Sequence, residues 1–342
     1  MAASKLRVAV IGTGSLGKEH ARIYHELAKS GPVCLAGVYD AHPETARKIA
    51  DRLGVPAFDS LVEAAASAEA FSVVTPTRTH FEIARDLLEQ GKHVLVEKPM
   101  TDHAEQAADL VECARRRQVI LQVGHVERFN PVFSWLQEAA THPRFIECHR
   151  LSPYPARSTD IGVVLDLMIH DLDVILALVR APVQSVEGVG VKVLSGREDI
   201  ANARLRFANG CVANLTASRI SPERLRKIRV FSGGAQPAYV SLDYRAQEGY
   251  IYRIAREDEP ESSLLTKLMK AKDSAIVSEF GGRRIVREPV PLNKEEPLRL
   301  ELSHFVQCVL ARKTPKVSGA SAKDALDLAF EITRQIDAAS AA

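Results

Sequence analysis

The first third of the chain alternates short β-type runs with helical stretches, and this alternation restricts the fold more than any other feature. Six runs carry it, at residues 7–11, 33–39, 57–58, 71–75, 93–97 and 119–123. The stretches between them contain helix-start and helix-stop residues, and one of these stretches begins at Pro43 and ends at Gly54. Strands that alternate with helices at this spacing predict a doubly wound, parallel α/β sheet over residues 1–124.

The pattern changes after Gly124. The β-type runs now follow one another directly, at 146–151, 183–194, 201–207, 211–218, 227–232 and 239–245. Asn209-Gly210, between two of them, predicts a tight hairpin in which both turn residues have positive φ. Helices are expected at 131–140, 163–180, 296–311 and 322–336, and an exposed loop at 257–274. Residues 125–342 are therefore predicted to form an α+β domain with a mostly antiparallel, open sheet.

The size of the chain, 342 residues and 37.5 kDa, suits two domains. Its 45 basic and 43 acidic side chains leave a net charge of +2, which gives no sign of a nucleic-acid partner. No apolar stretch approaches the roughly 20 residues of a membrane-spanning helix, and residues 1–10 lack the apolar segment of a signal peptide. The five cysteines are widely spaced and form no Cys-x-x-Cys pair, which fits reduced thiols. We expect a soluble cytoplasmic protein.

A glycine-rich turn ends the first β-type run. Its sequence, Gly12-Thr13-Gly14-Ser15-Leu16-Gly17, is a GxGxxG pattern at the start of a predicted helix. Glycines there permit a tight turn, the close approach of a pyrophosphate and close packing of the helix on the strand. Asp40 follows about 20 residues later, where a carboxylate binds the ribose hydroxyls of a dinucleotide and repels a 2′-phosphate. The pattern predicts NAD as the cofactor, and the nearby Arg47 and His42 leave NADP open.

Two further motifs lie at the carboxyl ends of predicted strands. Thr75-Pro76-Thr77 follows the fourth run, and Glu97-Lys98-Pro99 follows the fifth. Open α/β sheets bind ligands at this edge, so Lys98 would lie beside a bound nicotinamide. A proline-stiffened loop and a surface lysine are the structural alternatives. The predicted cofactor contacts are Gly12, Gly14, Ser15, Leu16, Gly17, Asp40, Thr75, Pro76, Thr77, His80, Glu97 and Lys98.

Asp166 and His170 are the candidate residues for proton transfer in the second domain. Their i, i+4 spacing places both on one face of a predicted, strongly apolar helix. Polar groups on such a helix need satisfied hydrogen bonds or a chemical role, and a carboxylate one turn away can orient the imidazole. A structural role for His170 stays open. No metal is expected, because no third histidine or cysteine ligand stands near.

Three motifs in this order resemble the Gfo/Idh/MocA family of NAD(P)-dependent oxidoreductases. They are the glycine turn followed by His20, the strand end Glu97-Lys98-Pro99, and the DxxxHxxD pattern of Asp166, His170 and Asp173. The resemblance covers essentially the whole chain and implies a Rossmann domain before the α+β domain. It implies that Lys98 and His170 are the catalytic pair, that Asp166 contacts substrate, and that the Lys98–Pro99 bond is cis. It also implies a homodimer or homotetramer formed through the C-terminal sheet.

Segments 123–131, 150–155, 164–173 and 202–210 resemble one subgroup of that family, the UDP-N-acetylglucosamine 3-dehydrogenases, which feed the synthesis of amino-substituted lipid A. His125, Arg128 and Arg157 are further candidate substrate contacts, because two arginines can hold a diphosphate, although salt bridges explain them nearly as well.

The predicted reaction is the NAD-dependent oxidation of a secondary sugar hydroxyl to a ketone, with the 3-hydroxyl of UDP-N-acetylglucosamine as the first choice. Another sugar or an inositol is the alternative substrate. A non-catalytic, NAD-sensing regulator is the alternative class of function. A sensor has no need of an acid–base pair such as Lys98 and His170, so the pair favours an enzyme.

Overall fold

The structure is a computed structural model that describes residues 5–140, 142–154, 161–234, 237–255, 275–280 and 283–341. Contacts between Cα atoms divide the chain into two compact units, residues 1–129 with 296–327 and residues 130–295 with 328–342. The predicted domains were 1–124 and 125–342, so the structure differs in the placement of 125–129 and 296–327. Within the described ranges, no helix is long and apolar enough to cross a membrane.

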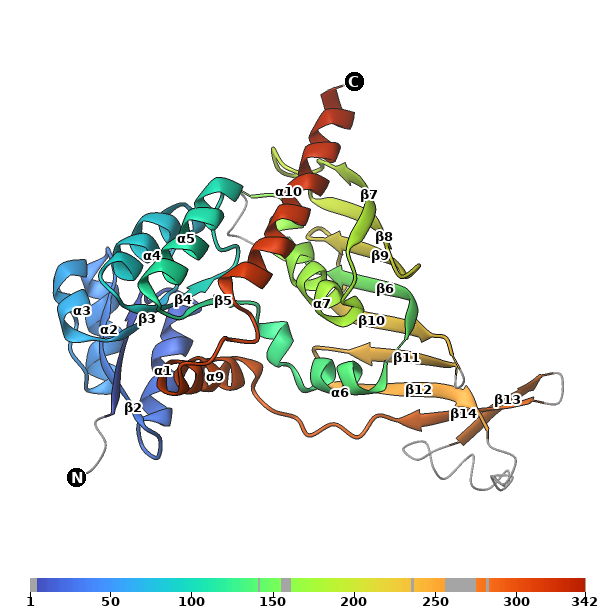
Figure 1. Cartoon of the computed structure of the whole chain (residues 1–342), viewed down its shortest axis with the longest axis horizontal. Helices are drawn as coiled ribbons and strands as arrows, with labels where there is room; N and C mark the ends of the chain where they lie inside the picture. Colours follow the sequence, from blue (N-terminus) through green and yellow to red (C-terminus); the bar gives the residue numbers. More distant parts are fainter. Residues whose placement is uncertain are drawn as a thin grey trace. The chain divides into compact units, whose positions relative to one another are not determined.

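The first unit contains a five-stranded sheet with the order β2-β1-β3-β4-β5, in which every neighbouring pair is parallel (Figure 1). Its strands are β1 (Leu6–Ile11), β2 (Val33–Tyr39), β3 (Ala70–Val73), β4 (His93–Glu97) and β5 (Leu121–Gly124). The predicted parallel sheet is confirmed. The prediction of a strand at 57–58 is wrong, since Ala57 forms only an isolated bridge with Val38. The chain turns soon afterwards at Ser60, whose side chain caps the next helix.

The helices around this sheet include one from the far end of the sequence. They are α1 (Gly17–Leu27), α2 (Pro43–Leu53), α3 (Leu61–Ser67), α4 (His80–Glu89), α5 (Ala104–Arg117) and α9 (Pro297–Ala311), with short 3-10 turns η1 (Thr77–Thr79) and η2 (Val126–Phe129). Apolar side chains of β1 and β2 share one core with α1, α2 and α9, to which α9 contributes Leu302, Phe305 and Val306. Burial of that apolar face is the physical reason why 296–311 joins the first unit.

The second unit contains a nine-stranded sheet with the order β13-β14-β12-β11-β10-β6-β9-β8-β7. Its strands are β6 (Pro143–Leu151), β7 (Val183–Val191), β8 (Ile200–Phe207), β9 (Val212–Ser218), β10 (Leu225–Ser232), β11 (Ala238–Asp243), β12 (Glu248–Ile254), β13 (Ala275–Phe280) and β14 (Arg283–Pro289). Neighbouring strands are antiparallel except for β6 and β9, so the mostly antiparallel sheet is confirmed. Strands β12 to β14 were not predicted, and the expected loop at 257–274 lies outside the described residues.

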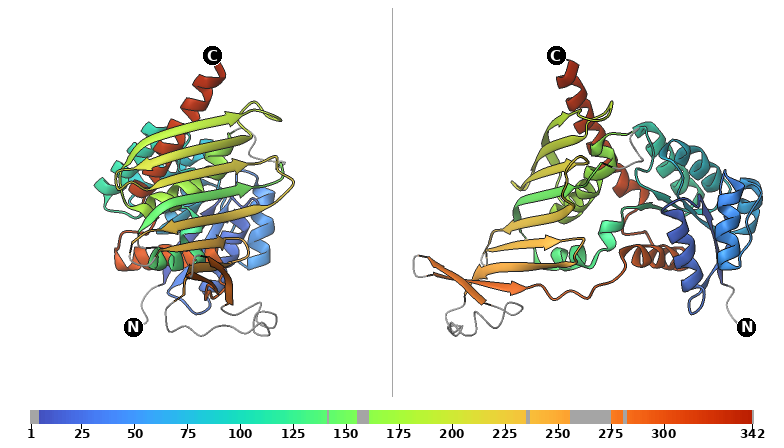
Figure 2. Two further views of the ribbon diagram at one scale, coloured as in Figure 1. Left: turned by 90° about the vertical axis from the view of Figure 1, so that its right-hand side faces the viewer. Right: turned by 180° about the vertical axis from the view of Figure 1, so that it is seen from behind.

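Helices cover one face of this second sheet (Figures 1 and 2). They are α6 (Pro131–Ala139), α7 (Ile169–Val179), which is preceded by the π-helical turn η3 (Val164–Met168), and the second-unit part of α10 (Gly319–Ala341). The covered face buries apolar side chains such as Ile146, Leu205 and Leu215. The left view of Figure 2 looks onto the opposite face, over which no helix of the described part of this unit lies.

The β8–β9 hairpin forms where it was predicted, but its turn differs from the expected one. Gly210 has φ +81°, whereas Asn209 is not among the described residues with positive φ. The Asn209 side-chain oxygen instead accepts a hydrogen bond from Cys211 N–H. The loop between the two strands is longer than two residues, so it needs only a single left-handed position, which the glycine supplies.

Candidate active site

Three strand ends meet at the carboxyl edge of the first sheet, where the strand order reverses between β1 and β3. Gly12 N–H donates to the Tyr39 carbonyl (2.7 Å), and Val74 N–H donates to the Ile11 carbonyl (2.8 Å). The loops that follow β1, β2 and β3 therefore start from one connected edge. Open α/β sheets bind their ligands at such a reversal of strand order.

The glycine turn has the shape that a dinucleotide pyrophosphate requires. Gly12 has φ +89°, and a Cβ there would lie 2.4 Å from the Val74 carbonyl oxygen. A Cβ on Gly17 would lie 1.9 Å from the Gly12 carbonyl oxygen, so both positions accept only glycine. At Gly14, in contrast, no atom of the described residues lies within 4 Å of the Cβ position. Gly14 and Ser15 are exposed in front of the amino end of α1, where backbone N–H groups bind phosphate.

Asp40 lies directly beside this turn. Its Oδ2 accepts hydrogen bonds from the Thr13 N–H (2.7 Å) and the Thr13 hydroxyl (3.0 Å), and its Oδ1 accepts one from His42 N–H (2.9 Å). A carboxylate accepts about four hydrogen bonds, so Asp40 retains capacity for a ribose hydroxyl while it holds the turn. The residues present therefore fit an NAD-type cofactor.

His80 joins two of the predicted cofactor loops. It is 1% exposed, and its Nδ1 lies 3.0 Å from the Pro99 carbonyl oxygen while its Nε2 lies 2.8 Å from the Thr75 carbonyl oxygen. Burial lowers the pKa of His80, against the raising effect of the two carbonyls. Because both ring nitrogens face the protein backbone, His80 holds the Thr75-Pro76-Thr77 loop and the loop after β4 in a fixed relation.

Lys98 leaves β4 at the same edge and is half-buried, with a cis peptide bond to Pro99. The preceding Glu97 is buried: its Oε1 lies 3.1 Å from the Nε2 of the fully buried His20, and its Oε2 accepts a bond from Lys98 N–H (3.3 Å). A Cβ on Gly124 would lie 2.6 Å from both carboxylate oxygens. Glu97 thus fixes the backbone from which Lys98 projects.

His125 stands next to Lys98 because Glu97 and Gly124 are paired in the parallel register of β4 and β5. Burial, followed by the charges of Lys98 and Arg128, lowers the pKa of His125 to about 3. The imidazole, 1% exposed, is therefore neutral at physiological pH. Arg128 is half-buried, and one of its guanidinium nitrogens donates to the Lys316 carbonyl (3.1 Å).

In the second unit, Asp166 lies in the π-helical turn η3 and His170 in the first turn of α7. Both side chains are partly exposed, whereas their neighbours Val164, Met168 and Ile169 are buried. The helix therefore turns its apolar residues inward and presents the two polar side chains, as the sequence pattern predicted. The π-helical turn itself was not predicted.

A buried ion pair holds the same helix to the sheet. Asp171, which follows His170, accepts two hydrogen bonds from Arg150 on β6, at 2.9 Å from Nε and 2.8 Å from a terminal nitrogen. The two residues are 5% and 3% exposed. The sequence contained a signal for this pair, an arginine and an aspartate on apolar elements, but no signal that linked the two positions.

The structure thus gathers the predicted residues at two places. The first unit brings the glycine turn, Asp40, Thr75, His80, Glu97, Lys98, His125 and Arg128 to one sheet edge, and the second unit places Asp166 and His170 on one helix. Arg157 lies outside the described residues. Among the residues whose structure is described, no three histidine, cysteine or acidic side chains gather as metal ligands would. Neither His20 nor Asp171 was proposed as a site residue.

Family models match both parts of the chain. A model described as an oxidoreductase family with an NAD-binding Rossmann fold, Gfo/Idh/MocA, matches residues 6–125. The model of the Gfo/Idh/MocA C-terminal domain matches residues 137–233.

Individual relatives align over nearly the whole chain. It is 34% identical to a UDP-N-acetylglucosamine 3-dehydrogenase from Acidithiobacillus ferrooxidans, over 97% of this chain and 98% of that enzyme. It is 27% identical to a scyllo-inositol 2-dehydrogenase (NAD(+)) from Bacillus subtilis, over 96% of this chain and 93% of that enzyme. The solved structure of the Acidithiobacillus ferrooxidans enzyme superposes with a TM-score of 0.85 over 98% of both chains. Levoglucosan dehydrogenase in complex with NADH and levoglucosan, at 18% identity, shares the fold with a TM-score of 0.79 over 98% of both chains.

Proposed function

Because the chain belongs to the Gfo/Idh/MocA family of NAD-binding oxidoreductases, we propose that it oxidises the 3-hydroxyl of UDP-N-acetylglucosamine to a ketone with NAD as the oxidant. One observation carries the proposal: Lys98 projects from the sheet edge that also holds the glycine turn, in a chain that aligns from end to end with an enzyme of that activity. An inositol is the second candidate substrate, favoured by the aligned inositol dehydrogenase.

The residues take complementary roles in this reaction. The glycine turn and Asp40 would hold NAD, which would supply the acceptor for the hydride of the carbinol carbon. His170 accepts the hydroxyl proton as general base, a role that histidine takes more often than any other side chain. Lys98 donates a hydrogen bond to the same oxygen and stabilises the negative charge that develops as its proton leaves. Asp166 orients the imidazole or binds a neighbouring sugar hydroxyl.

Other residues bind and select the substrate. His125, neutral because of its lowered pKa, offers a hydrogen bond without adding a positive charge beside Lys98. Arg128 and Arg157 bind the diphosphate, for which guanidinium groups are well matched. The ketone product is a substrate for amination, which agrees with a place in the synthesis of amino-substituted lipid A.

The cofactor choice rests on Asp40. Its carboxylate is held at the end of β2 by the Thr13 N–H and the Thr13 hydroxyl, so its negative charge cannot move away from a cofactor 2′-phosphate without loss of those bonds. We propose NAD rather than NADP on this ground.

We also propose that the protein is a homodimer or homotetramer that uses the open face of the second sheet. That face carries a row of partly exposed aromatic rings, with centroid separations of 5.5 Å for Phe145–Phe231, 4.6 Å for Phe231–Tyr239 and 5.1 Å for Tyr239–Tyr252. Such rings favour burial against a second copy. Light scattering should give a dimer or tetramer mass, and Tyr239→Asp should lower it. A monomeric wild-type protein would contradict the proposal.

We propose the cytoplasm as the location of the protein, because its five free cysteines fit a reducing compartment.

The activity is tested by the formation of NADH. Purified protein with NAD is offered UDP-N-acetylglucosamine, UDP-glucose, N-acetylglucosamine and myo-inositol. NADP is tested in parallel, and an aminotransferase with its amino donor is added to consume the ketone. We expect turnover with the UDP-N-acetyl sugar. Lys98→Met and His170→Asn should each lose about 10²-fold or more in kcat, whereas the exposed controls Lys48→Met and His103→Asn should not. Turnover of myo-inositol alone would transfer the assignment to the second candidate.

A further inference from the structure

The helical segment that carries Asp166 and His170 begins against a buried glutamate. Val163 N–H donates to the Glu198 carbonyl (2.9 Å), and Val164 N–H donates to the Glu198 Oε1 (3.2 Å). The first N–H groups of a helix have no acceptor within the helix itself, and Glu198, which is 1% exposed, supplies two for them. A carboxylate also interacts favourably with the positive end of the helix dipole.

Gly162 gives the carboxylate room to reach these N–H groups. A Cβ at this position would lie 1.8 Å from the Glu198 Oε1 and 2.2 Å from its Cδ. Any side chain at 162 would therefore push Glu198 away from the start of the helix. Asp166 N–H in turn donates to the Gly162 carbonyl (3.0 Å), so the backbone of Asp166 depends directly on this junction.

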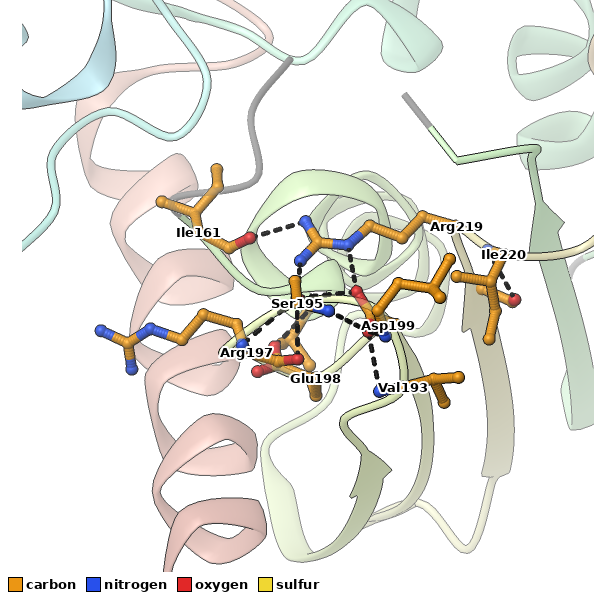
Figure 3. A network of polar contacts seen from close by, with 11 residues as sticks. Ile161, Val193, Ser195, Arg197, Glu198, Asp199, Arg219 and Ile220 are labelled. Atoms are coloured by element: carbon orange, nitrogen blue, oxygen red, sulfur yellow. Dashed lines mark hydrogen bonds and ion pairs between the residues drawn. The ribbon is translucent and has the colours of Figure 1, made fainter. Parts of the chain in front are cut away.

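Arg219 connects the two chain segments that meet here (Figure 3). It follows β9 and is fully buried. Its guanidinium donates to the Ile161 carbonyl (2.7 Å), to the Ser195 hydroxyl (2.8 Å) and to the Asp199 Oδ1 (2.9 Å). One side chain thus holds both Ile161, two residues before Val163, and the turn that carries Glu198.

Asp199 makes that turn rigid. Its Oδ2 accepts hydrogen bonds from the N–H groups of Val193 (2.8 Å), Leu194 (2.6 Å) and Ser195 (3.0 Å). Burial alone would raise the pKa of Asp199, but these N–H donors together with Arg219 and the Ser195 hydroxyl hold it well below its usual range. The turn therefore keeps its charge and its shape across the working pH range of an enzyme.

We infer that Glu198 and Arg219 are positioning residues for catalysis. They fix how the first helical turns, from Val163 onward, are rotated about the helix axis and placed along it, and these turns present Asp166 and His170. The inference rests on the proposed function, because its importance depends on the roles given to those two side chains. The helix is also held further along by the Arg150–Asp171 pair. Loss of the Glu198 cap therefore shifts the first turns without releasing the whole helix. A displacement of about 1 Å at a reacting group can cost about 10²-fold in rate.

The test compares variants that keep or remove individual hydrogen bonds. Glu198→Ala removes the acceptor for Val164 N–H, and Glu198→Gln keeps an oxygen there. Arg219→Met removes the guanidinium donors. Arg197→Met is the matched control, because Arg197 lies in the same turn but its side chain is 54% exposed and extends away from the cluster (Figure 3).

Turnover is measured per folded molecule, with UDP-N-acetylglucosamine that carries deuterium or hydrogen at C3. Glu198→Ala and Arg219→Met should lower kcat about 10- to 100-fold, enlarge the primary deuterium isotope effect and leave the KM for NAD unchanged. Glu198→Gln and Arg197→Met should stay within about threefold of wild type. A purely structural role would lower the melting temperature and leave kcat per folded molecule and the isotope effect unchanged, and this result would overturn the inference.

Hydrogen exchange supplies a readout that does not depend on turnover. Backbone amides of residues 163–170 should exchange faster in Glu198→Ala than in wild type or Arg197→Met, with no change in β1 to β5. Unchanged exchange at 163–170 would overturn the inference even if activity fell. Absence of turnover in the wild-type protein with every sugar would instead refute the proposed function, and the exchange comparison would still decide whether Glu198 fixes the start of the helix.

Discussion

The lowered pKa of His125 makes a prediction about stability at acid pH. In the unfolded chain His125 takes up a proton near pH 6.5, whereas in the folded protein it does so near pH 3. The folded pKa is the lower one, so the stabilising contribution is complete above pH 6.5 and is lost as the pH falls toward 3. A pH of 5 lies about 1.5 pH units below the histidine pKa of the unfolded chain, and each of these pH units lowers the free energy of unfolding by about 1.36 kcal/mol. The expected loss is about 2 kcal/mol.

The comparison of wild type with His125→Asn isolates this term. Urea unfolding at pH 7.5 and pH 5.0 gives the loss in unfolding free energy for each protein, and the wild type should lose about 2 kcal/mol more than the variant. His103→Asn is the control, because its side chain is 67% exposed and should not change the pH dependence. Equal losses in wild type and His125→Asn, or an imidazole of His125 that titrates near pH 6.5 by NMR in the folded protein, would refute the reasoning.

Asp40→Ala should lower the ratio of kcat/KM with NAD to that with NADP about tenfold or more, because the negative charge that opposes a 2′-phosphate is lost; an unchanged ratio would show that Asp40 does not select the cofactor. Gly17→Ala should prevent the native fold, because its Cβ would lie 1.9 Å from a backbone oxygen. Gly14→Ala should fold normally, because its Cβ position is open, but it should weaken NAD binding measured by calorimetry. Asp171→Ala should cost about 3–5 kcal/mol in urea unfolding, because it removes the carboxylate that accepts two hydrogen bonds from the buried Arg150 guanidinium. Arg150→Met with Asp171→Leu should recover most of that loss, and a double variant as unstable as the single one would contradict this account.

The fold could be predicted from the sequence where local patterns decide it. Strand–helix alternation gave the parallel sheet of the first unit, and successive β-type runs gave the antiparallel sheet of the second. The packing of α9 against β1 and β2 could not be predicted in the same way. The apolar face of 297–311 predicts a helix but not which core it packs against, because its packing depends on contacts between residues about 300 positions apart.

In the candidate site too, residues placed by local sequence patterns could be predicted, and residues placed by long-range contacts could not. The glycine turn, Asp40 and Lys98 are recognisable because a turn, a strand end and a spacing place them. His80 was predicted as a cofactor contact, yet both of its ring nitrogens face backbone carbonyls. The spacing of residues in the sequence does not predict these two contacts. Glu198 carries no local signal either, since its partners are the N–H groups of Val163 and Val164 in a segment distant in the sequence.

The assignment of the reacting carbon is the central claim, and isotope transfer tests it most directly. The protein is incubated with NAD and UDP-N-acetylglucosamine deuterated at C3 or, in a separate reaction, at C4. The mass of the NADH formed is then measured by mass spectrometry. We predict that NADH gains one deuterium from the C3-labelled sugar and none from the C4-labelled sugar. Deuterium in NADH from the C4 label, or unlabelled NADH from the C3-labelled sugar, would contradict oxidation of the 3-hydroxyl.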